Sequence, residues 1–229
     1  MKTIGLIGGI TWYSTLDYYR LLNELVNKKL GGVHSAKIIL SSVDFAEIKL
    51  LTEKLDWDGL AEIMKTSAKS IEAAGGDCIL ICANTMHKIA DEIQSAVSIP
   101  IIHIADAVAE AIKIKQLKKV ALLGTKYTMQ LDFYKNKLAT YGIDVIIPNE
   151  TAVEFINDSI YNEFGKGIFL PERKQQFLHI IDSLIKQGAE GVILGCTEIP
   201  ILIKQEDCPV PVFDTAFIHA DAAVKFALT

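Results

Sequence analysis

Two stretches of the chain, Ile4–Gly9 (IGLIGG) and Val120–Thr125 (VALLGT), lie 116 positions apart and share one pattern of small and apolar residues. A second pair, Gly75–Ile81 (GGDCILI) and Gly188–Leu194 (GAEGVIL), lies 113 positions apart. Continuous apolar runs with little alternation are typical of parallel strands that helices cover on both faces. We therefore expect two similar α/β halves related by a pseudo-twofold axis.

Short β-branched runs alternate with longer helical patterns along the rest of the chain, which indicates an α/β protein. The expected strands are 3–8, 36–42, 77–83, 100–103, 119–124, 143–147, 190–195 and 211–213. The expected helices are 14–30, 57–74, 86–96, 105–115, 129–141, 151–164, 171–187 and 216–227.

The predicted fold class is α/β, with two pseudo-symmetric three-layer halves that each contain a parallel sheet. The first half is expected to take residues 1–98 plus 212–229, and the second half residues 99–211. Ligands of such sheets bind beyond the carboxyl ends of the strands, so the active site is expected in the cleft between the halves.

Composition excludes several classes of function. The 229 residues are 50% apolar and 22% charged, and the net charge of −5 is not gathered into a long run of either sign. Nucleic-acid and polybasic membrane binding need clustered Lys and Arg, so neither is expected. No apolar run reaches the roughly 18 residues of a membrane span. Four cysteines in a chain of this length do not make a disulfide framework, which favours the reducing cytoplasm.

The most informative side chains follow two equivalent strands. Cys196 comes directly after the predicted strand 190–195 and is followed by Thr197 and Glu198. A cysteine at the carboxyl end of a parallel strand, next to the start of a helix, has the geometry of a nucleophile or acid/base, because the helix amides favour the thiolate. Cys78 lies inside a predicted strand and is expected to be a small buried apolar residue.

Three motifs carry a resemblance. Gly8–Trp12 (GGITW), Asn84–His87 (NTMH) and Gly195–Pro200 (GCTEIP) occur in the order and spacing of the aspartate/glutamate racemase family. The resemblance covers essentially the whole chain, and the second motif is similar to the subgroup that includes broad-specificity amino-acid racemases. It implies a cofactor-independent reaction without pyridoxal phosphate, an acidic amino acid (aspartate or glutamate) as favoured substrate, and a homodimer.

The reaction that the resemblance implies is a two-base inversion at Cα. A thiolate removes the α-proton while a group on the opposite face returns one. A carbanion beside a carboxylate is very unstable, so such a site needs a positioned base, a positioned acid and donors for the carboxylate. On this basis Cys196 is the first predicted catalytic residue.

One position departs from the family pattern. The family carries its other catalytic residue, Cys or Thr, immediately before Asn-Thr, and this chain has Ala83 there. The repeat offset of 113 independently places Ala83 opposite Cys196. Cys82 is one residue earlier, and in an extended strand its side chain points to the other face. We carry Cys82 as the second predicted catalytic residue, on the condition that the strand has already turned into its loop.

Three interpretations of Ala83 stay open. Cys82, Thr85 or an ordered water acts as the second acid/base in a working racemase. Alternatively, the protein works from one face only, like the single-cysteine arylmalonate decarboxylase branch of the same superfamily. The third interpretation is a small-molecule-binding protein with a degenerate site. The racemase is placed first because the other motifs follow that subgroup.

Eight further residues are predicted to contact the substrate. They lie in glycine-rich turns, at strand ends or at helix starts, where backbone amides and hydroxyls bind carboxylates, or they match positions of the family: Gly9, Trp12, Ser42, Asn84, Thr85, Thr125, Lys166 and Thr197. Capping of the following helix is the structural alternative for Asn84, Thr85 and Thr197.

A metal site is not expected. Cys78 and Cys82 are four residues apart, which on a strand separates them by roughly 13 Å, beyond the reach of one ion. The chain has no Cys-x-x-Cys or His-x-x-x-His pair and no phosphate-binding loop of the Rossmann or Walker type.

Overall fold

The computed structural model describes residues 1–229 and divides into two compact units. Unit 1 comprises Met1–Ile104 and His219–Thr229, and unit 2 comprises Ala105–Ile218. The sequence analysis placed the return to the first half at residue 212. In the structure Val212–Asp214 forms strand β7, which pairs with a strand of unit 2, so the chain returns only after Ile218.

Unit 1 is built on a three-stranded parallel sheet of order β2-β1-β3. Its strands are β1 (Ile4–Gly8), β2 (Ile38–Ser42) and β3 (Cys78–Ile81). All residues of β1 and β3 are buried, whereas β2 is an edge strand with an alternating exposed side. The sequence had predicted a strand at 100–103, but this segment contributes only a single parallel bridge between Ile101 and Ile79.

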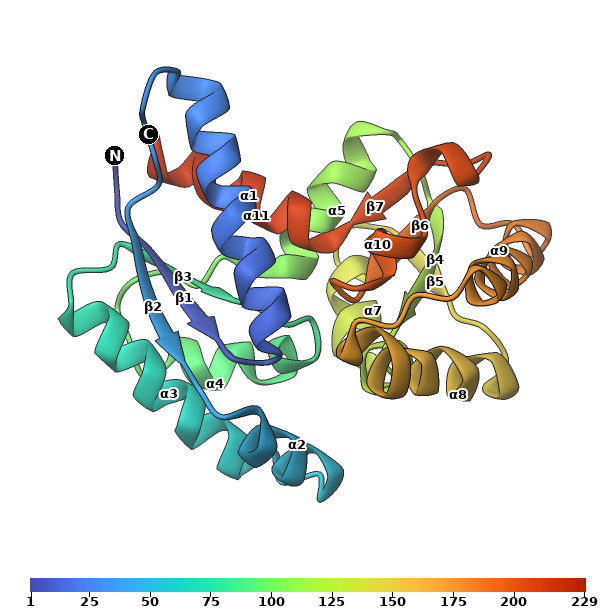
Figure 1. Cartoon of the computed structure of the whole chain (residues 1–229), viewed down its shortest axis with the longest axis horizontal. Coiled ribbons are helices and arrows are strands. Elements are labelled where there is room, and N and C mark those ends of the chain that lie inside the picture. Colours follow the sequence, from blue (N-terminus) through green and yellow to red (C-terminus); the bar gives the residue numbers. More distant parts are fainter. The chain divides into compact units, whose positions relative to one another are not determined.

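Helices cover both faces of this sheet (Figure 1). On one face lie α1 (Trp12–Leu30) and α11 (Thr215–Ala227), and on the other lie α3 (Trp57–Ala73) and α4 (Ala90–Gln94). The apolar core on the α3 side contains Leu60, Met64 and Ile71 together with side chains of β1 and β3. The short helix α2 (Phe45–Glu53) begins where Asp44 accepts a hydrogen bond from the amide of Ala46, which is a side-chain cap.

Unit 2 contains a four-stranded parallel sheet of order β5-β4-β6-β7. Its strands are β4 (Lys119–Gly124), β5 (Asp144–Ile146), β6 (Val192–Gly195) and β7. The order β5-β4-β6 repeats the order β2-β1-β3, and β7 occupies the place that the Ile101 bridge holds in unit 1. The predicted α/β class with two parallel sheets is confirmed.

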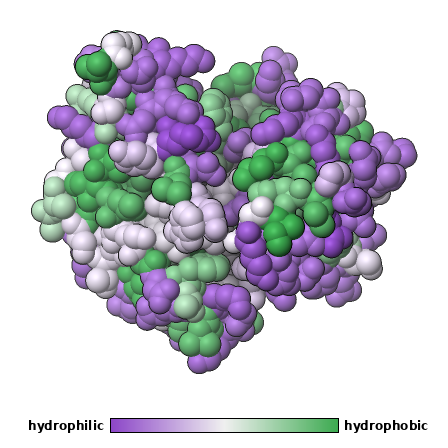
Figure 2. Space-filling model, viewed as in Figure 1, coloured by the Kyte–Doolittle hydropathy of each residue, from purple (hydrophilic) through white to green (hydrophobic).

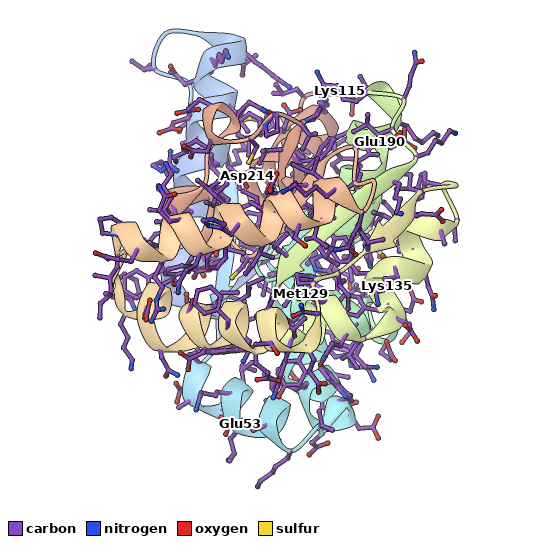
Figure 3. The ribbon with its side chains drawn as sticks, turned by 90° about the vertical axis from the view of Figure 1, so that its right-hand side faces the viewer. Glu53, Lys115, Met129, Lys135, Glu190 and Asp214 are labelled. Atoms are coloured by element: carbon purple, nitrogen blue, oxygen red, sulfur yellow. The ribbon has the colours of Figure 1, made fainter.

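The helices of unit 2 are α5 (Ile104–Ile114), α6 (Lys126–Gln130), α7 (Asp132–Ala139), α8 (Glu150–Asp158), α9 (Pro171–Lys186) and α10 (Ile199–Leu202). The first residue of α5, Ile104, is the last residue of the first segment of unit 1. Helices α8 and α9 both contact β4, and Figure 3 shows them crossing in front of the sheet. The buried side chains Phe177, Ile181 and Leu184 form the inner face of α9.

Several element boundaries differ from the expectation for local reasons. The predicted helix 129–141 is divided into α6 and α7 because Leu131 is extended, with ψ of 141°. The predicted helix 151–164 ends in a π-helical turn, Ser159–Glu163, and a 3-10 turn, Phe164–Lys166. The predicted helix 86–96 is a 3-10 turn, Thr85–Ile89, followed by α4. A further 3-10 turn spans Gln205–Asp207.

The lengths and compositions of the helices show whether any of them could span a membrane. None of them combines the length and the apolar character that crossing a lipid bilayer requires.

Candidate active site

In unit 1 the loops after all three strands lie at one edge of the sheet. Gly9 follows β1 with a φ of +87°, and a Cβ there would stand 2.2 Å from the carbonyl oxygen of Val43. Only glycine tolerates both the positive φ and this close approach. The same Cβ would be 2.9 Å from Ser42 Oγ. Ser42 and Gly9, two of the predicted substrate contacts, therefore lie side by side.

The start of α1 completes this edge. The amide of Gly9 donates a 2.8 Å hydrogen bond to Thr15 Oγ1, and the Thr11 side chain caps the helix by accepting from Ser14 N. Trp12 is 54% exposed and stacks on Tyr13 with ring centroids 3.8 Å apart. It therefore packs on its neighbour at the molecular surface of unit 1.

At the end of β3 the side chains of Cys82 and Ala83 differ sharply in exposure. Cys82 is fully buried, and its burial raises the pKa of the thiol far above the ordinary range. Ala83 is partly exposed. The strand ends at Ile81, so the condition set for Cys82 is met, yet the thiol still faces the interior. Burial therefore counts against Cys82 as an acid/base, because it leaves solvent and substrate no access.

Asn84 and Thr85 follow at the start of a 3-10 turn and are 5% and 8% exposed. They lie at the carboxyl edge of the sheet, where the sequence analysis expected them. Asn84 makes no side-chain cap to the turn that it precedes, so the capping alternative does not explain it.

In unit 2 the equivalent strand ends carry the thiol. Gly124 of β4 is in register with Gly195 of β6, and a Cβ on Gly124 would stand 2.8 Å from the Gly195 carbonyl oxygen. This close approach of the two backbones explains the glycines that end both apolar runs. Cys196 follows at once, partly exposed, at the carboxyl end of the sheet.

Cys196 is hydrogen-bonded to a carboxylate. Its Sγ donates to Glu198 Oε2 at 2.9 Å, and Thr197 Oγ1 donates to the same oxygen at 2.7 Å. Glu198 is only 7% exposed. Burial raises the pKa of the Cys196 thiol well above its ordinary value, and the negative charge of Glu198 raises it further. The thiol therefore keeps its proton at rest, and it donates this proton to Glu198 in a hydrogen bond.

Two threonines border this group. Thr125, 8% exposed, caps α6 by accepting from the amide of Thr128 at 3.3 Å. Thr125 thus has a structural role as a helix cap, and the substrate contact expected at this residue stays a prediction. Thr215, at the start of α11, donates to the carbonyl oxygen of Leu194 at 2.9 Å and so ties the end of β6 to the segment after β7.

Lys166 is the last residue of the 3-10 turn Phe164–Lys166. It is exposed on the turn that follows the π-helical segment, and it forms no ion pair. Its turn is well anchored, since Phe164 is 2% exposed and stacks on Phe169 with centroids 5.2 Å apart. Just before the turn, Glu163 pairs with Arg173 through two guanidinium nitrogens.

The sequence analysis did not identify some of the polar residues at these edges. Ser14 and Thr15 on α1 and His103 before α5 had no signal of their own, because a lone Ser, Thr or His in an apolar pattern is common. Glu198 had a signal, namely an acid two residues after the candidate thiol, and the structure adds its buried contact with Cys196.

No group of three or more His, Cys, Asp or Glu side chains is arranged to hold a metal ion. The polar groups at both sheet edges include hydroxyls, amides, the Cys196 thiol and the Glu198 carboxylate. Such groups move protons and bind carboxylates.

Comparison with known proteins now assigns the family. The family model described as Asp/Glu/Hydantoin racemase matches residues 7–223, nearly the whole chain. The chain belongs to the Asp/Glu/hydantoin racemase family.

Solved structures of the racemase family support the same assignment. A candidate Asp/Glu racemase from Yersinia pestis is 48% identical with a TM-score of 0.94, and each chain is covered completely. PH1733, an aspartate racemase homologue from Pyrococcus horikoshii, is 40% identical with a TM-score of 0.89, again with both chains covered completely. The broad-specificity amino-acid racemase RacX of Bacillus subtilis is 27% identical over 174 residues, which are 75% of this chain and 74% of RacX.

Proposed function

We propose that this chain is a cofactor-independent racemase of acidic amino acids, aspartate or glutamate, with Cys196 as a catalytic acid/base. The observation that carries the proposal is the hydrogen bond from Cys196 Sγ to the buried Glu198 carboxylate at the carboxyl end of β6. Membership of the racemase family and the likeness to PH1733 support the choice of substrate class.

The chemistry follows from the raised pKa of the thiol. A thiolate of high proton affinity is a strong base for an α-proton, but it is rarely formed in water at neutral pH. Glu198 accepts the thiol proton, so that Cys196 can remove the α-proton of the substrate and later return one. In this proposal Thr197, beside Cys196, helps to hold the substrate carboxylate.

The experiment is proton NMR in deuterium oxide with L- and D-aspartate and glutamate, together with chiral chromatography. We expect deuterium at Cα together with inversion, without added pyridoxal phosphate and without inhibition by hydroxylamine. Cys196→Ala should lower the rate by a factor of about 10² to 10⁴, the usual contribution of a positioned acid/base. Cys208→Ala is the matched control, because Cys208 is a free buried cysteine of the same unit outside the site. Turnover by the Cys196 variant at the wild-type rate would overturn the mechanism.

A second candidate function rests on Ala83. Position 83 is partly exposed but carries no acid or base, and the thiol of Cys82 is buried. A protein with one thiol can exchange or deliver a proton on one face only, as in the decarboxylase branch of the superfamily. Exchange of the α-proton with retention, or formation of one enantiomer from an arylmalonate, would support this function. Ala83→Cys should then raise inversion, whereas an unchanged rate would show that the missing side chain is not limiting.

We also propose that the protein acts as a homodimer in the cytoplasm. Large apolar side chains of α1 and β2 are exposed: Trp12, Leu16, Tyr19 and Leu40 are between 48% and 56% accessible. They form the α1–β2 patch, over which apolar atoms gather in Figure 2. The four free cysteines suit a reducing compartment.

A further inference from the structure

Two buried side chains hold the backbone at the end of β3. Ser14 of α1 donates to the carbonyl oxygen of Cys82 at 2.5 Å, and His87 Nδ1 lies 2.9 Å from the carbonyl oxygen of Ala83. Ser14 and His87 are each 3% exposed. The carbonyl groups of the two peptides that flank the Cα of Ala83 are therefore held from two different elements.

The chemistry of the acceptor defines the state of His87. A carbonyl only accepts, so Nδ1 carries the hydrogen and Nε2 carries the lone pair. Burial lowers the pKa of His87 well below its ordinary value, and the neighbouring His103 and His219 lower it further. His87 is therefore neutral, and its Nε2 is buried without a hydrogen-bond partner.

An unpaired buried lone pair destabilises a fold, so packing alone favours an apolar residue at position 87. What the imidazole supplies, and an apolar side chain does not, is the Nδ1–H bond to Ala83. The bond is thus the physical reason for a histidine at this place.

The ring of His87 is itself held by a chain of aromatic groups. Its centroid lies 4.8 Å from His103 and 5.4 Å from His219. His219 of α11 donates from Nε2 to the carbonyl oxygen of Ile102 at 2.5 Å and accepts from the hydroxyl of Tyr18 at 2.8 Å. The rotamer of His87 is therefore determined by α1, α11 and the segment before α5.

We propose that Ser14 and His87 are positioning residues that direct the side chain at position 83 out of the sheet while Cys82 stays buried. The inference rests on the proposed function, because position 83 is where the family pattern places the second acid/base and where this chain carries Ala83. It assigns a role to two residues that touch no reacting atom: they set the backbone from which the reacting side chain would emerge.

The test places a reporter at position 83 and needs no turnover. In Ala83→Cys protein, the rate at which iodoacetamide alkylates the new thiol is measured by peptide-mapping mass spectrometry, which separates it from the other cysteines. His87→Ala, His87→Asn and His87→Gln are then added to this protein. Asn keeps a donor at the δ position of the side chain, whereas Gln moves the donor one bond further away.

We expect His87→Ala and His87→Gln to raise the alkylation rate at position 83 at least fivefold, because the released strand end exposes the thiol more often. His87→Asn should stay within twofold of the parent. His179→Ala is the matched control: exposed His179 makes the same Nδ1 contact with the carbonyl four residues earlier, Gln175, at 2.8 Å. Ser14→Ala should raise the alkylation rate in the same way as His87→Ala. Ser70→Ala is its control, because exposed Ser70 also donates to a backbone carbonyl, that of Thr66.

The outcomes separate the inference from the proposed function. Equal rates for the Ala, Asn and Gln variants would overturn the positioning role, whether or not the protein racemises amino acids. If the alkylation rates of the His87→Asn and His87→Gln variants differ as expected but the wild-type protein does not racemise amino acids, the positioning role stands and the proposed function is overturned. Thermal unfolding of each variant identifies a misfolded protein, and the Asn and Gln pair decides the question if the Ala variant does not fold.

Discussion

At the scale of single residues, the decisive feature is the pairing of Cys196 with Glu198. Both were visible in the sequence, but only their 2.9 Å contact and the burial of Glu198 show that the carboxylate acts on the thiol. The same scale separates Cys82 from Ala83, which are neighbours in sequence, because Cys82 is fully buried and Ala83 is partly exposed.

Glu198→Gln should therefore lower the pKa of the Cys196 thiol. Glu198 raises this pKa because its negative charge disfavours the thiolate, and the amide has no such charge. The pKa should stay above the ordinary value, since burial is the larger cause. The pH dependence of Cys196 alkylation, followed by peptide mapping, measures this shift, and an unchanged midpoint would contradict it. Racemisation should fall in the same variant, because the thiol loses its proton acceptor.

At the scale of elements, the buried histidines join α1, α11 and the 3-10 turn after β3. Burial lowers the pKa of His219 to about 3, from an ordinary value near 6.5. The neutral form is thus favoured in the folded protein. The stability that this provides is complete above about pH 6.5 and is lost as the pH falls toward 3.

We expect the free energy of unfolding to decrease by about 1.4 kcal/mol per pH unit per buried histidine between about pH 5.5 and pH 4, below the unfolded and above the folded pKa of His219. His219→Gln keeps a donor for the Ile102 carbonyl but does not titrate, so it should flatten this slope. Urea unfolding at several pH values measures the slope, with His179→Gln as an exposed control. A slope that is the same in both variants would show that His219 does not titrate on unfolding.

At the scale of the whole molecule, the α1–β2 patch bears on assembly. Leu16 and Tyr19 lie three residues apart on α1, and Leu40 is on the edge strand β2. A Cβ on Gly8 would meet both Thr15 and Leu40 within 2.9 Å, so Leu40 stands on the α1 side of the sheet. Exposed contiguous apolar side chains of this kind mark protein interfaces.

The charge variant Leu16→Glu should convert the proposed homodimer into a monomer, because burying an unpaired carboxylate in an interface is unfavourable. Size-exclusion chromatography with light scattering gives the mass of each form. Leu170→Glu is the control, since Leu170 is similarly exposed, at 42%, but belongs to unit 2. A wild-type mass of about 25 kDa would exclude the dimer at the concentration used.

Local patterns in the sequence determined the α/β class, the doubled sheet and the position of Cys196. Strand ends and glycine turns depend on nearby residues, so the repeat at offsets of 116 and 113 was sufficient to predict two similar halves. The structure then gave their matching strand orders, β2-β1-β3 and β5-β4-β6. Boundaries were less predictable where the backbone conformation of one residue decides, as at Leu131 between α6 and α7.

Only the tertiary structure decided which thiol is accessible, which carboxylate acts on it and which side chains hold the end of β3. Ser14 and Cys82 are 68 residues apart, and His219 meets Tyr18 from 201 residues away. No local pattern specifies such pairs. They exist because the burial of α1 and α11 on one sheet brings polar atoms out of water, where each must find a partner or raise the free energy of the fold.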